Sequence, residues 1–158
     1  MHLLLQQKGT IAEEGEAIDL GQSPGRIAVL TAADTEIAVL AAAREGAQGR
    51  VIAVCQPHRY SRTVHLMDDF GRSFYQADSV YVLEIYAASE RAIEGVSGQA
   101  IVERLRAYGH RSAEYAGTMD RAVEAVLAEA REGDLIITLG AATAYFRVAL
   151  ASGTTPVP

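Results

Sequence analysis

Three side chains that can carry positive charge follow a short apolar run in the sequence. Pro57 breaks the run that begins with Val51–Cys55, and three basic residues come within the next five positions: His58, Arg59 and Arg62. Guanidinium groups make paired hydrogen bonds to carboxylates and phosphates, and the N-terminus of the helix expected next also attracts anions. The pattern predicts a site for a carboxylate or another anion. A solvated basic turn with a purely structural role is the alternative.

A second candidate segment covers residues 84–98 and reads EIYAASERAIEGVSG. It follows another apolar run and carries Glu84, Tyr86 and Glu90. A carboxylate at the end of a strand can order neighbouring arginines or hold the ammonium group of a ligand. The alternative is a long surface loop whose acidic side chains are only solvated.

A third segment, residues 140–143, reads GAAT and lies between an apolar run and an expected helix. Glycine and small residues allow a backbone to approach a ligand closely. Gly140 and Thr143 are therefore candidate cofactor-binding residues, and a tightly packed turn explains them equally well.

Motifs for several other chemistries are absent from the sequence. It contains no G-x-x-x-x-G-K-[ST] or G-x-G-x-x-G phosphate loop, no G-x-S-x-G nucleophile elbow and no Cys/His cluster with metal-ligand spacing. We therefore assign no catalytic residue and no metal ligand. We interpret His65 and His110 as surface histidines, and the single cysteine, Cys55, as a core residue.

Composition limits the classes of partner. The chain has 158 residues, is 49% hydrophobic and carries a formal net charge of -6, which argues against a general nucleic-acid binder. No apolar run approaches the roughly 20 residues that span a bilayer, and the N-terminus has too short an apolar core for a signal peptide. A single cysteine allows no internal disulfide. We expect no membrane partner and a cytoplasmic location.

Apolar runs and caps predict alternating strands and helices. Strands are expected at 27–30, 51–55, 79–85, 111–115 and 135–139, and helices at 35–45, 64–77, 98–108, 119–131 and 141–151. This order predicts an α/β fold with a Rossmann-like, doubly wound, mostly parallel sheet over residues 26–158. Residues 1–25 are expected to form an irregular segment or a hairpin that starts with a short strand at 1–6. Sites in such sheets lie outside the carboxyl ends of the strands.

The stretch around the basic turn also resembles a known family. Residues 51–63, VIAVCQPHRYSRT, contain the Q-P-H-R-[YF]-[ST]-R-T pattern of the C-terminal domain of the Mur ligases, and among these resemble the UDP-N-acetylmuramate–L-alanine ligases most. Residues 67–78 (MDDFGRSFYQAD), the 84–98 segment and residues 133–141 (GDLIITLGA) are similar to further segments of that domain in the same order. The similarity runs from Pro24 to Leu150.

The resemblance implies a role in peptidoglycan precursor synthesis. In the three-domain Mur ligases, ATP and Mg²⁺ activate a carboxylate as an acyl phosphate, and an amino group then attacks it to form an amide. The C-terminal domain closes over the site and receives the amino acid, while the other two domains hold the UDP-sugar and ATP. The implied partners are L-alanine or a related amino acid, UDP-N-acetylmuramate and partner ligase domains. No cofactor is expected to bind tightly to this chain alone.

The same resemblance implies roles for the candidate residues. His58, Arg59 and Arg62 would hold the carboxylate of the amino acid and offset phosphate charge. The resemblance also implies that Glu84, Tyr86 and Glu90 bind the substrate. It implies the same cofactor-binding role for Gly140 and Thr143 that their position suggests.

The sequence departs from the family pattern in its loops. The family's D-D-Y-[AG]-H-H-P-T-E loop is replaced by VLTAADTE at residues 29–36, its G-A-G-[ND] turn reads GAAT at 140–143, and Glu84 stands where an Asp is usual. Two interpretations follow. The chain is either an amino-acid-positioning part of a ligase, as a fragment or the product of a split gene and inactive alone, or a catalytically dead binding or interaction module. An independent hydrolase or transferase has no supporting motif.

Overall fold

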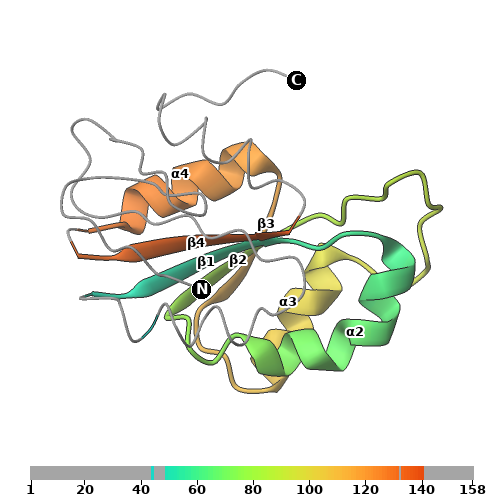
Figure 1. Cartoon of the computed structure of the whole chain (residues 1–158), viewed down its shortest axis with the longest axis horizontal. Coiled ribbons are helices and arrows are strands. Elements are labelled where there is room, and N and C mark those ends of the chain that lie inside the picture. Colours follow the sequence, from blue (N-terminus) through green and yellow to red (C-terminus); the bar gives the residue numbers. More distant parts are fainter. Residues whose placement is uncertain (1–43, 45–48, 132, 141–158) are drawn as a thin grey trace, which may run out of the picture.

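The computed structural model describes residue 44, residues 49–131 and residues 133–140 of the chain. Within these ranges strands and helices alternate, as Figure 1 shows. The bounds are β1 (Val51–Gln56), α2 (Tyr60–Ser73), β2 (Ser79–Leu83), α3 (Gly98–Ala107), β3 (Ala113–Gly117), α4 (Met119–Glu129) and β4 (Leu135–Gly140). The elements predicted over 1–6, 27–30, 35–45 and 141–151 lie outside the described residues, apart from Arg44, which is helical.

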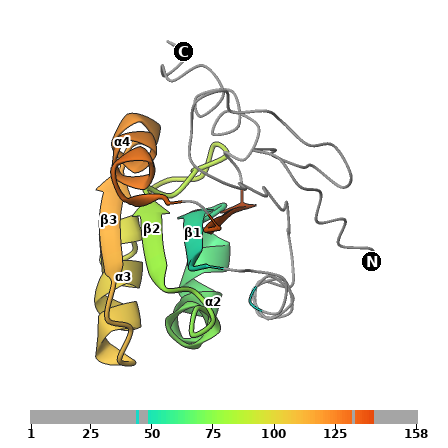
Figure 2. The same ribbon diagram turned by 90° about the vertical axis from the view of Figure 1, so that its left-hand side faces the viewer.

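The described strands form one parallel sheet in the order β3-β2-β1-β4. Figure 2 shows β3, β2 and β1 side by side. In the register of the central strand, Val54 lies opposite Tyr81 of β2 and Thr138 of β4. Strands buried on both faces are typical of parallel sheets, and β1, β2 and β4 are buried along nearly their whole length. The predicted α/β fold with a parallel sheet is confirmed.

Helices cover both faces of the sheet, so the core has two layers (Figure 1). On one face, Phe74, which directly follows α2, and Leu105 of α3 pack against alternate residues of β1, among them Ala53 and Cys55. On the other face, Val126 of α4 belongs to a cluster with the intervening strand residues, such as Ile52 and Val54. Burial of one large apolar side chain stabilises a fold by about 1.5–3 kcal/mol, so these two clusters hold the strand ends in fixed positions. Cys55 lies in the core, as predicted.

The start of α2 differs from the prediction. We expected Thr63 to cap a helix that begins at residue 64, but α2 begins at Tyr60. Thr63 is buried inside the first turn, and its hydroxyl donates to the carbonyl of Arg59, 2.8 Å away. Val64, expected on the apolar stripe, is 42% exposed. The predicted start was wrong because a threonine that bonds back along a helix looks in sequence like an N-cap.

Smaller differences concern the strand ends and one histidine. β2 ends at Leu83, and β3 covers Ala113–Gly117 rather than 111–115. His110, expected at the surface, is half-buried. Its Nε2 lies 3.0 Å from the carbonyl of Ala77, and its Nδ1 lies 3.3 Å from the backbone N–H of Ser112. The ring therefore joins the turn after α2 to the segment before β3.

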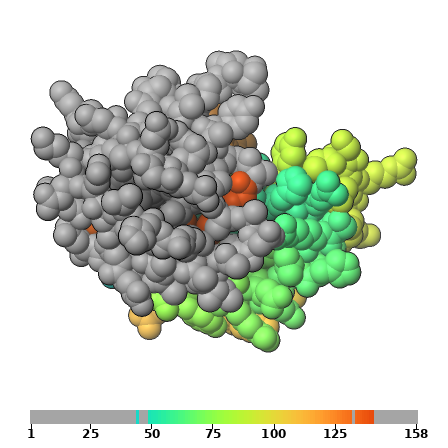
Figure 3. Space-filling model, in the orientation of Figure 1, coloured from blue at the N-terminus to red at the C-terminus, as the bar shows by residue number. Residues whose placement is uncertain are grey.

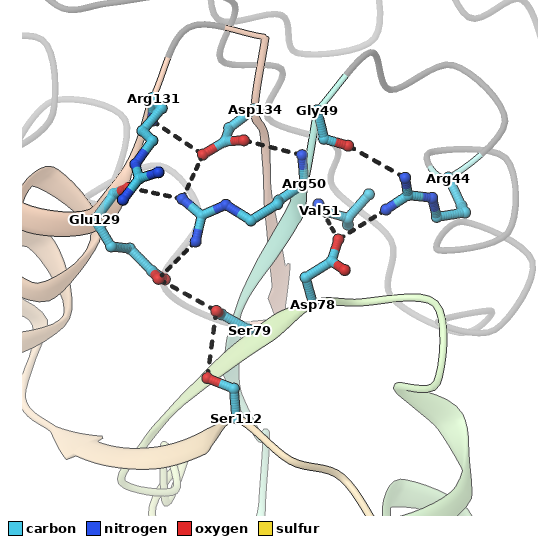
Figure 4. A network of polar contacts seen from close by, with 10 residues as sticks. All are labelled: Arg44, Gly49, Arg50, Val51, Asp78, Ser79, Ser112, Glu129, Arg131 and Asp134. Carbon is cyan, nitrogen blue, oxygen red and sulfur yellow. Dashed lines mark hydrogen bonds and ion pairs between the residues drawn. The ribbon is translucent and has the colours of Figure 1, made fainter.

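A network of hydrogen bonds and ion pairs lies at the edge of the sheet where the strands begin (Figure 4). Arg50 Nη2 donates to Asp134 Oδ2 at 2.6 Å and to the carbonyl of Glu129 at 2.7 Å. The backbone N–H groups of Arg50 and Arg131 also donate to the Asp134 carboxylate. Burial raises the pKa of Asp134, but these hydrogen bonds outweigh it and hold that pKa below 3.8. The network ties the starts of β1 and β4 to the end of α4.

No helix among the described residues is long and apolar enough to cross a membrane.

Candidate functional site

The turn after β1 is joined to the segment after β2 by an extension of the sheet. The backbone N–H of Tyr86 donates to the carbonyl of Pro57 at 2.9 Å, and the N–H of Arg59 donates to the carbonyl of Tyr86 at 2.8 Å. His58 and Tyr86 thereby form a parallel bridge beyond the ends of both strands. The sheet architecture thus brings two of the sequence-predicted segments together at its carboxyl edge.

The side chains at this bridge also contact each other. The rings of His58 and Tyr86 stack with their centroids 5.6 Å apart and their planes at 17°. Offset stacking of aromatic rings is favourable by about 0.5–1.5 kcal/mol beyond burial. Tyr86 is nevertheless 52% exposed, so the stack presents an aromatic face to solvent. His58 therefore has a fixed ring orientation at the edge where sites in parallel sheets lie.

Arg59 occupies an unusual backbone conformation between β1 and α2. Its φ is 67° and its ψ 137°, a region that residues with a side chain rarely adopt and that costs of order 1–3 kcal/mol. The residue is held there from both sides, because its N–H donates to Tyr86 and its carbonyl accepts from the N–H and the hydroxyl of Thr63. The strained turn directs the chain from the strand into the helix within a few residues.

Both arginines of the basic turn have exposed side chains at the carboxyl end of β1. An anion site requires this exposure, since covered side chains cannot receive a ligand. Figure 3 shows that the start of α2 and the loop over residues 84–97 gather at the same end of the molecule. Anion binding by His58, Arg59 and Arg62 stays a prediction.

Glu90 lies against the first turn of α2. Its Oε2 accepts from the backbone N–H of Ser61 at 2.9 Å, and its Oε1 accepts from the Ser61 hydroxyl at 2.7 Å. The first N–H groups of a helix have no partner within the helix, and the side chain of Arg59, at the N-cap position, makes no capping hydrogen bond to them. These bonds with Ser61, together with the nearby charge of Arg59, lower the pKa of Glu90 below its usual 4.5. A carboxylate of the chain itself thus caps α2.

Glu84 has a comparable position at the start of α3. Its Oε1 accepts from the N–H groups of Ile85 and Gly98, and its Oε2 accepts from the phenol of Tyr115 at 2.6 Å. Burial raises the pKa of Glu84, but the three hydrogen bonds together outweigh burial and hold it below 4.5. The carboxylate therefore orders the ends of β2 and β3 and the N-terminus of α3.

Gly140 ends β4 beside the central strand. It has a φ of +94°, and a Cβ there would lie 2.0 Å from the carbonyl oxygen of Gln56. This close approach to a neighbouring strand explains the glycine as a packed turn, which was one of the two alternatives. A role of Gly140 in cofactor binding stays a prediction, and Thr143 lies outside the described residues.

Two residues that the sequence did not single out bind the carboxylates of Glu90 and Glu84. Ser61 was read only as part of a family pattern, yet it supplies both donors to Glu90. Tyr115 lies in the strand expected over 111–115 and was not a candidate site residue, yet it supplies the phenol that binds Glu84. A serine at the start of a helix and a glutamate in a later loop give no local pattern that pairs them.

The described residues do not offer a cluster of ligands for Mg²⁺, the metal that the family resemblance implies. Within that part of the chain no group of three or more His, Cys, Asp or Glu side chains is arranged to hold a metal ion. We therefore derive no step that passes through ATP or Mg²⁺.

Comparisons with known proteins agree with this architecture. The family described as "Mur ligase, glutamate ligase domain" matches residues 28–142. The UDP-N-acetylmuramate–L-alanine ligase of Solibacter usitatus is 56% identical over 112 residues, which make up 70% of this chain and 24% of that relative. The ligase of the same name from Rhizobium meliloti is 46% identical over 114 residues, 72% of this chain and 24% of the relative.

A solved structure supports the same fold. The crystal structure of the UDP-N-acetylmuramate-alanine ligase MurC from Thermotoga maritima aligns with a TM-score of 0.58 at 19% identity, over 82% of this chain and 28% of that one. At this identity the likeness bears on the fold alone. The chain spans about 24% of the length of the first two curated relatives.

Proposed function

The chain belongs to the Mur ligase family and carries its C-terminal domain, and from this membership we propose that it receives and orients the amino acid in the synthesis of a peptidoglycan precursor. The similarity to UDP-N-acetylmuramate–L-alanine ligases supports L-alanine, or a related amino acid, as the ligand. UDP-N-acetylmuramate and the remaining ligase domains are the proposed partners, and we place the reaction in the cytoplasm.

One observation carries the proposal. The turn after β1 presents His58, Arg59 and Arg62 at the carboxyl edge of a parallel sheet, with the ring of His58 fixed by its stack on Tyr86. Guanidinium groups suit a planar carboxylate, and charge-assisted hydrogen bonds to it are about twice as strong as neutral ones. Glu84 and Glu90 support the site by ordering its walls.

The proposed role is binding and orientation. Holding the carboxylate of the amino acid points its amino group at the carbon that it must attack, which lowers the entropic cost of the reaction. The sequence contains no phosphate loop with its lysine, so we propose that this chain alone does not catalyse the ligation.

The experiment is a titration of the ¹⁵N-labelled chain with L-alanine, followed by backbone amide shifts. We expect shifts at residues 58–62 in the wild type and their loss in Arg59→Ala/Arg62→Ala, because each lost charged hydrogen bond weakens binding about tenfold or more. Arg91→Ala, which removes an exposed arginine of the 84–97 loop, is the matched control and should bind normally. Equal binding of L-alaninamide, which has no carboxylate, would contradict the proposal.

A second candidate function has its own support in the sequence. The loops at 29–36 and 140–143 depart from the family pattern, which favours a module that keeps the fold and binds without taking part in catalysis. An assay with separately supplied ligase domains distinguishes the two. Amide formation that depends on Arg59 supports the ligase role, whereas binding without product supports the module.

A further inference from the structure

The loop between β2 and α3 is attached to the rest of the domain at two places on either side of Arg59. At Tyr86 it joins the extended sheet through two backbone hydrogen bonds. At Glu90 it joins the first turn of α2 through Ser61. The short segment between these attachments therefore runs past the strained turn that carries His58 and Arg59.

The attachment at Glu90 differs from an ordinary surface contact. Both carboxylate oxygens are used, each at a distance typical of a strong hydrogen bond, and one donor is an N–H at the start of a helix. The loop itself is costly to hold, because Ala88 and Ser89 both have positive φ values of 47° and 70°. A loop in such a conformation needs a contact at its far side to keep it in place.

We propose that Glu90 is a positioning residue: its carboxylate holds the 84–97 loop against α2 and thereby fixes the backbone of Arg59 and the His58–Tyr86 stack. The inference deepens the proposed function and rests on it only for the identity of the ligand. Glu90 acts through the loop and α2, and needs no contact with the amino acid.

Hydrogen exchange in the ligand-free chain tests the positioning role. The amides of Arg59 and Tyr86 are the reporters, because they form the bridge and donate to the carbonyls of Tyr86 and Pro57, not to Glu90. In Glu90→Ala we expect their exchange to rise about tenfold. Glu90→Gln keeps an oxygen that accepts from the Ser61 N–H and should restore most of the protection.

The matched control is Glu94→Ala, which removes an exposed acid from the same loop without touching Ser61. It should leave the exchange of both reporter amides unchanged. If their exchange rose as much in Glu94→Ala as in Glu90→Ala, the negative charge of the loop, and not the contact of Glu90 with Ser61, would be responsible. Unchanged protection in Glu90→Ala would overturn the inference. Thermal unfolding of each variant shows that the domain itself stays folded.

A second arm separates this inference from the proposed function. If wild-type chain binds L-alanine, Glu90→Ala should weaken binding about tenfold while Glu90→Gln and Glu94→Ala stay near wild type. Equal L-alanine affinity in Glu90→Ala and wild type would overturn the link to the ligand. A wild type that does not bind L-alanine contradicts the proposed function, while the exchange of the Arg59 and Tyr86 amides still decides the positioning role.

Discussion

The phenol of Tyr115 donates a 2.6 Å hydrogen bond to the carboxylate of Glu84, and so joins the end of β3 to the end of β2. The other oxygen of that carboxylate holds the N–H of Gly98 at the start of α3. One glutamate thus connects three elements at the edge of the sheet where the candidate site lies. Removing the Glu84 carboxylate should therefore disturb β2, β3 and the start of α3.

The Tyr115–Glu84 bond predicts an abnormal tyrosine titration. The Glu84 carboxylate accepts a hydrogen bond from the phenol and repels the phenolate, and together with burial it raises the pKa of Tyr115 from 10.0 to about 12. In Glu84→Gln the pKa of Tyr115 should fall toward 10. The ¹³Cζ shift of Tyr115 as a function of pH measures its pKa. The control is Glu114→Gln, which changes the neighbouring residue but leaves the bond to Glu84 in place, and it should keep the pKa near 12. A value that stays near 12 in Glu84→Gln would show that burial, not the carboxylate, causes the shift.

Comparing two glycines with the same φ predicts how much stability is lost when a side chain is placed where β4 approaches β1 closely. Gly140 and Gly109 both have φ +94°, but a Cβ at Gly140 meets the Gln56 carbonyl at 2.0 Å, whereas a Cβ at Gly109 meets nothing within 4 Å. Gly109→Ala should cost only the positive-φ strain, about 1 kcal/mol. Gly140→Ala should cost about 1–3 kcal/mol more, because backbone must move. Urea unfolding of the two variants gives the difference, and equal losses would contradict the steric explanation.

Most of the fold could be predicted because its signals are local. The apolar runs of β1 and β4 indicate strands buried on both faces, and parallel order follows from the alternation with helices. The starts of α3 and α4 were also placed correctly, since their caps Ser97 and Thr118 accept from N–H groups only three residues away. In each of these cases the interaction lies within one turn of the chain.

The parts that could not be predicted depend on pairs distant in sequence. The cap of α2 is Glu90, 29 residues after its partner Ser61, so the helix start was placed too late. Tyr115 meets Glu84 across the pairing of β2 with β3, two strands that are far apart in the sequence and whose register shifts between Val82 and Leu83. The basic turn, by contrast, was found because its three cationic residues lie together in the sequence. Its partner Tyr86 was found as a candidate, but the stack on His58 was not.

The network at the opposite edge predicts a large stability loss on removal of Asp134. Its side chain is 5% exposed and accepts from Arg50 and from the backbone of Arg131. Asp134→Ala removes the acceptor of the Arg50 and Arg131 backbone N–H groups and one of the partners of the Arg50 guanidinium, which keeps its contacts with Glu129. The change should destabilise the domain by about 3 kcal/mol. Glu124→Ala, at an exposed position of α4, should change stability by less than about 0.5 kcal/mol. Thermal or urea unfolding compares the two, and similar losses would contradict this account.

The same residue predicts how stability changes with acid. The folded-state pKa of Asp134 lies below its usual 3.8, so the unfolded chain takes up a proton at this group before the folded chain does. The stabilisation is present above pH 3.8 and is lost as the pH falls through the folded-state pKa. Unfolding free energies of wild type and Asp134→Asn should therefore converge as the pH is lowered below 3.8. Curves that stay parallel would show that Asp134 makes no such contribution.

The stack of Tyr86 on His58 predicts a spectroscopic effect with little change in stability. Tyr86→Ala removes the ring but keeps the backbone bonds to Pro57 and Arg59, so the bridge should persist and unfolding should become easier by no more than about 1 kcal/mol. The ring protons of His58 should move downfield, because they lose the ring-current shielding of a tyrosine 5.6 Å away. Tyr86→Phe keeps a ring and should preserve the shift, and Tyr75→Ala, another exposed tyrosine, should leave His58 unchanged. Unaltered His58 proton shifts in Tyr86→Ala would contradict the stack. Without the stack, the His58 ring could rotate freely, and the site would bind a carboxylate with less geometric selectivity.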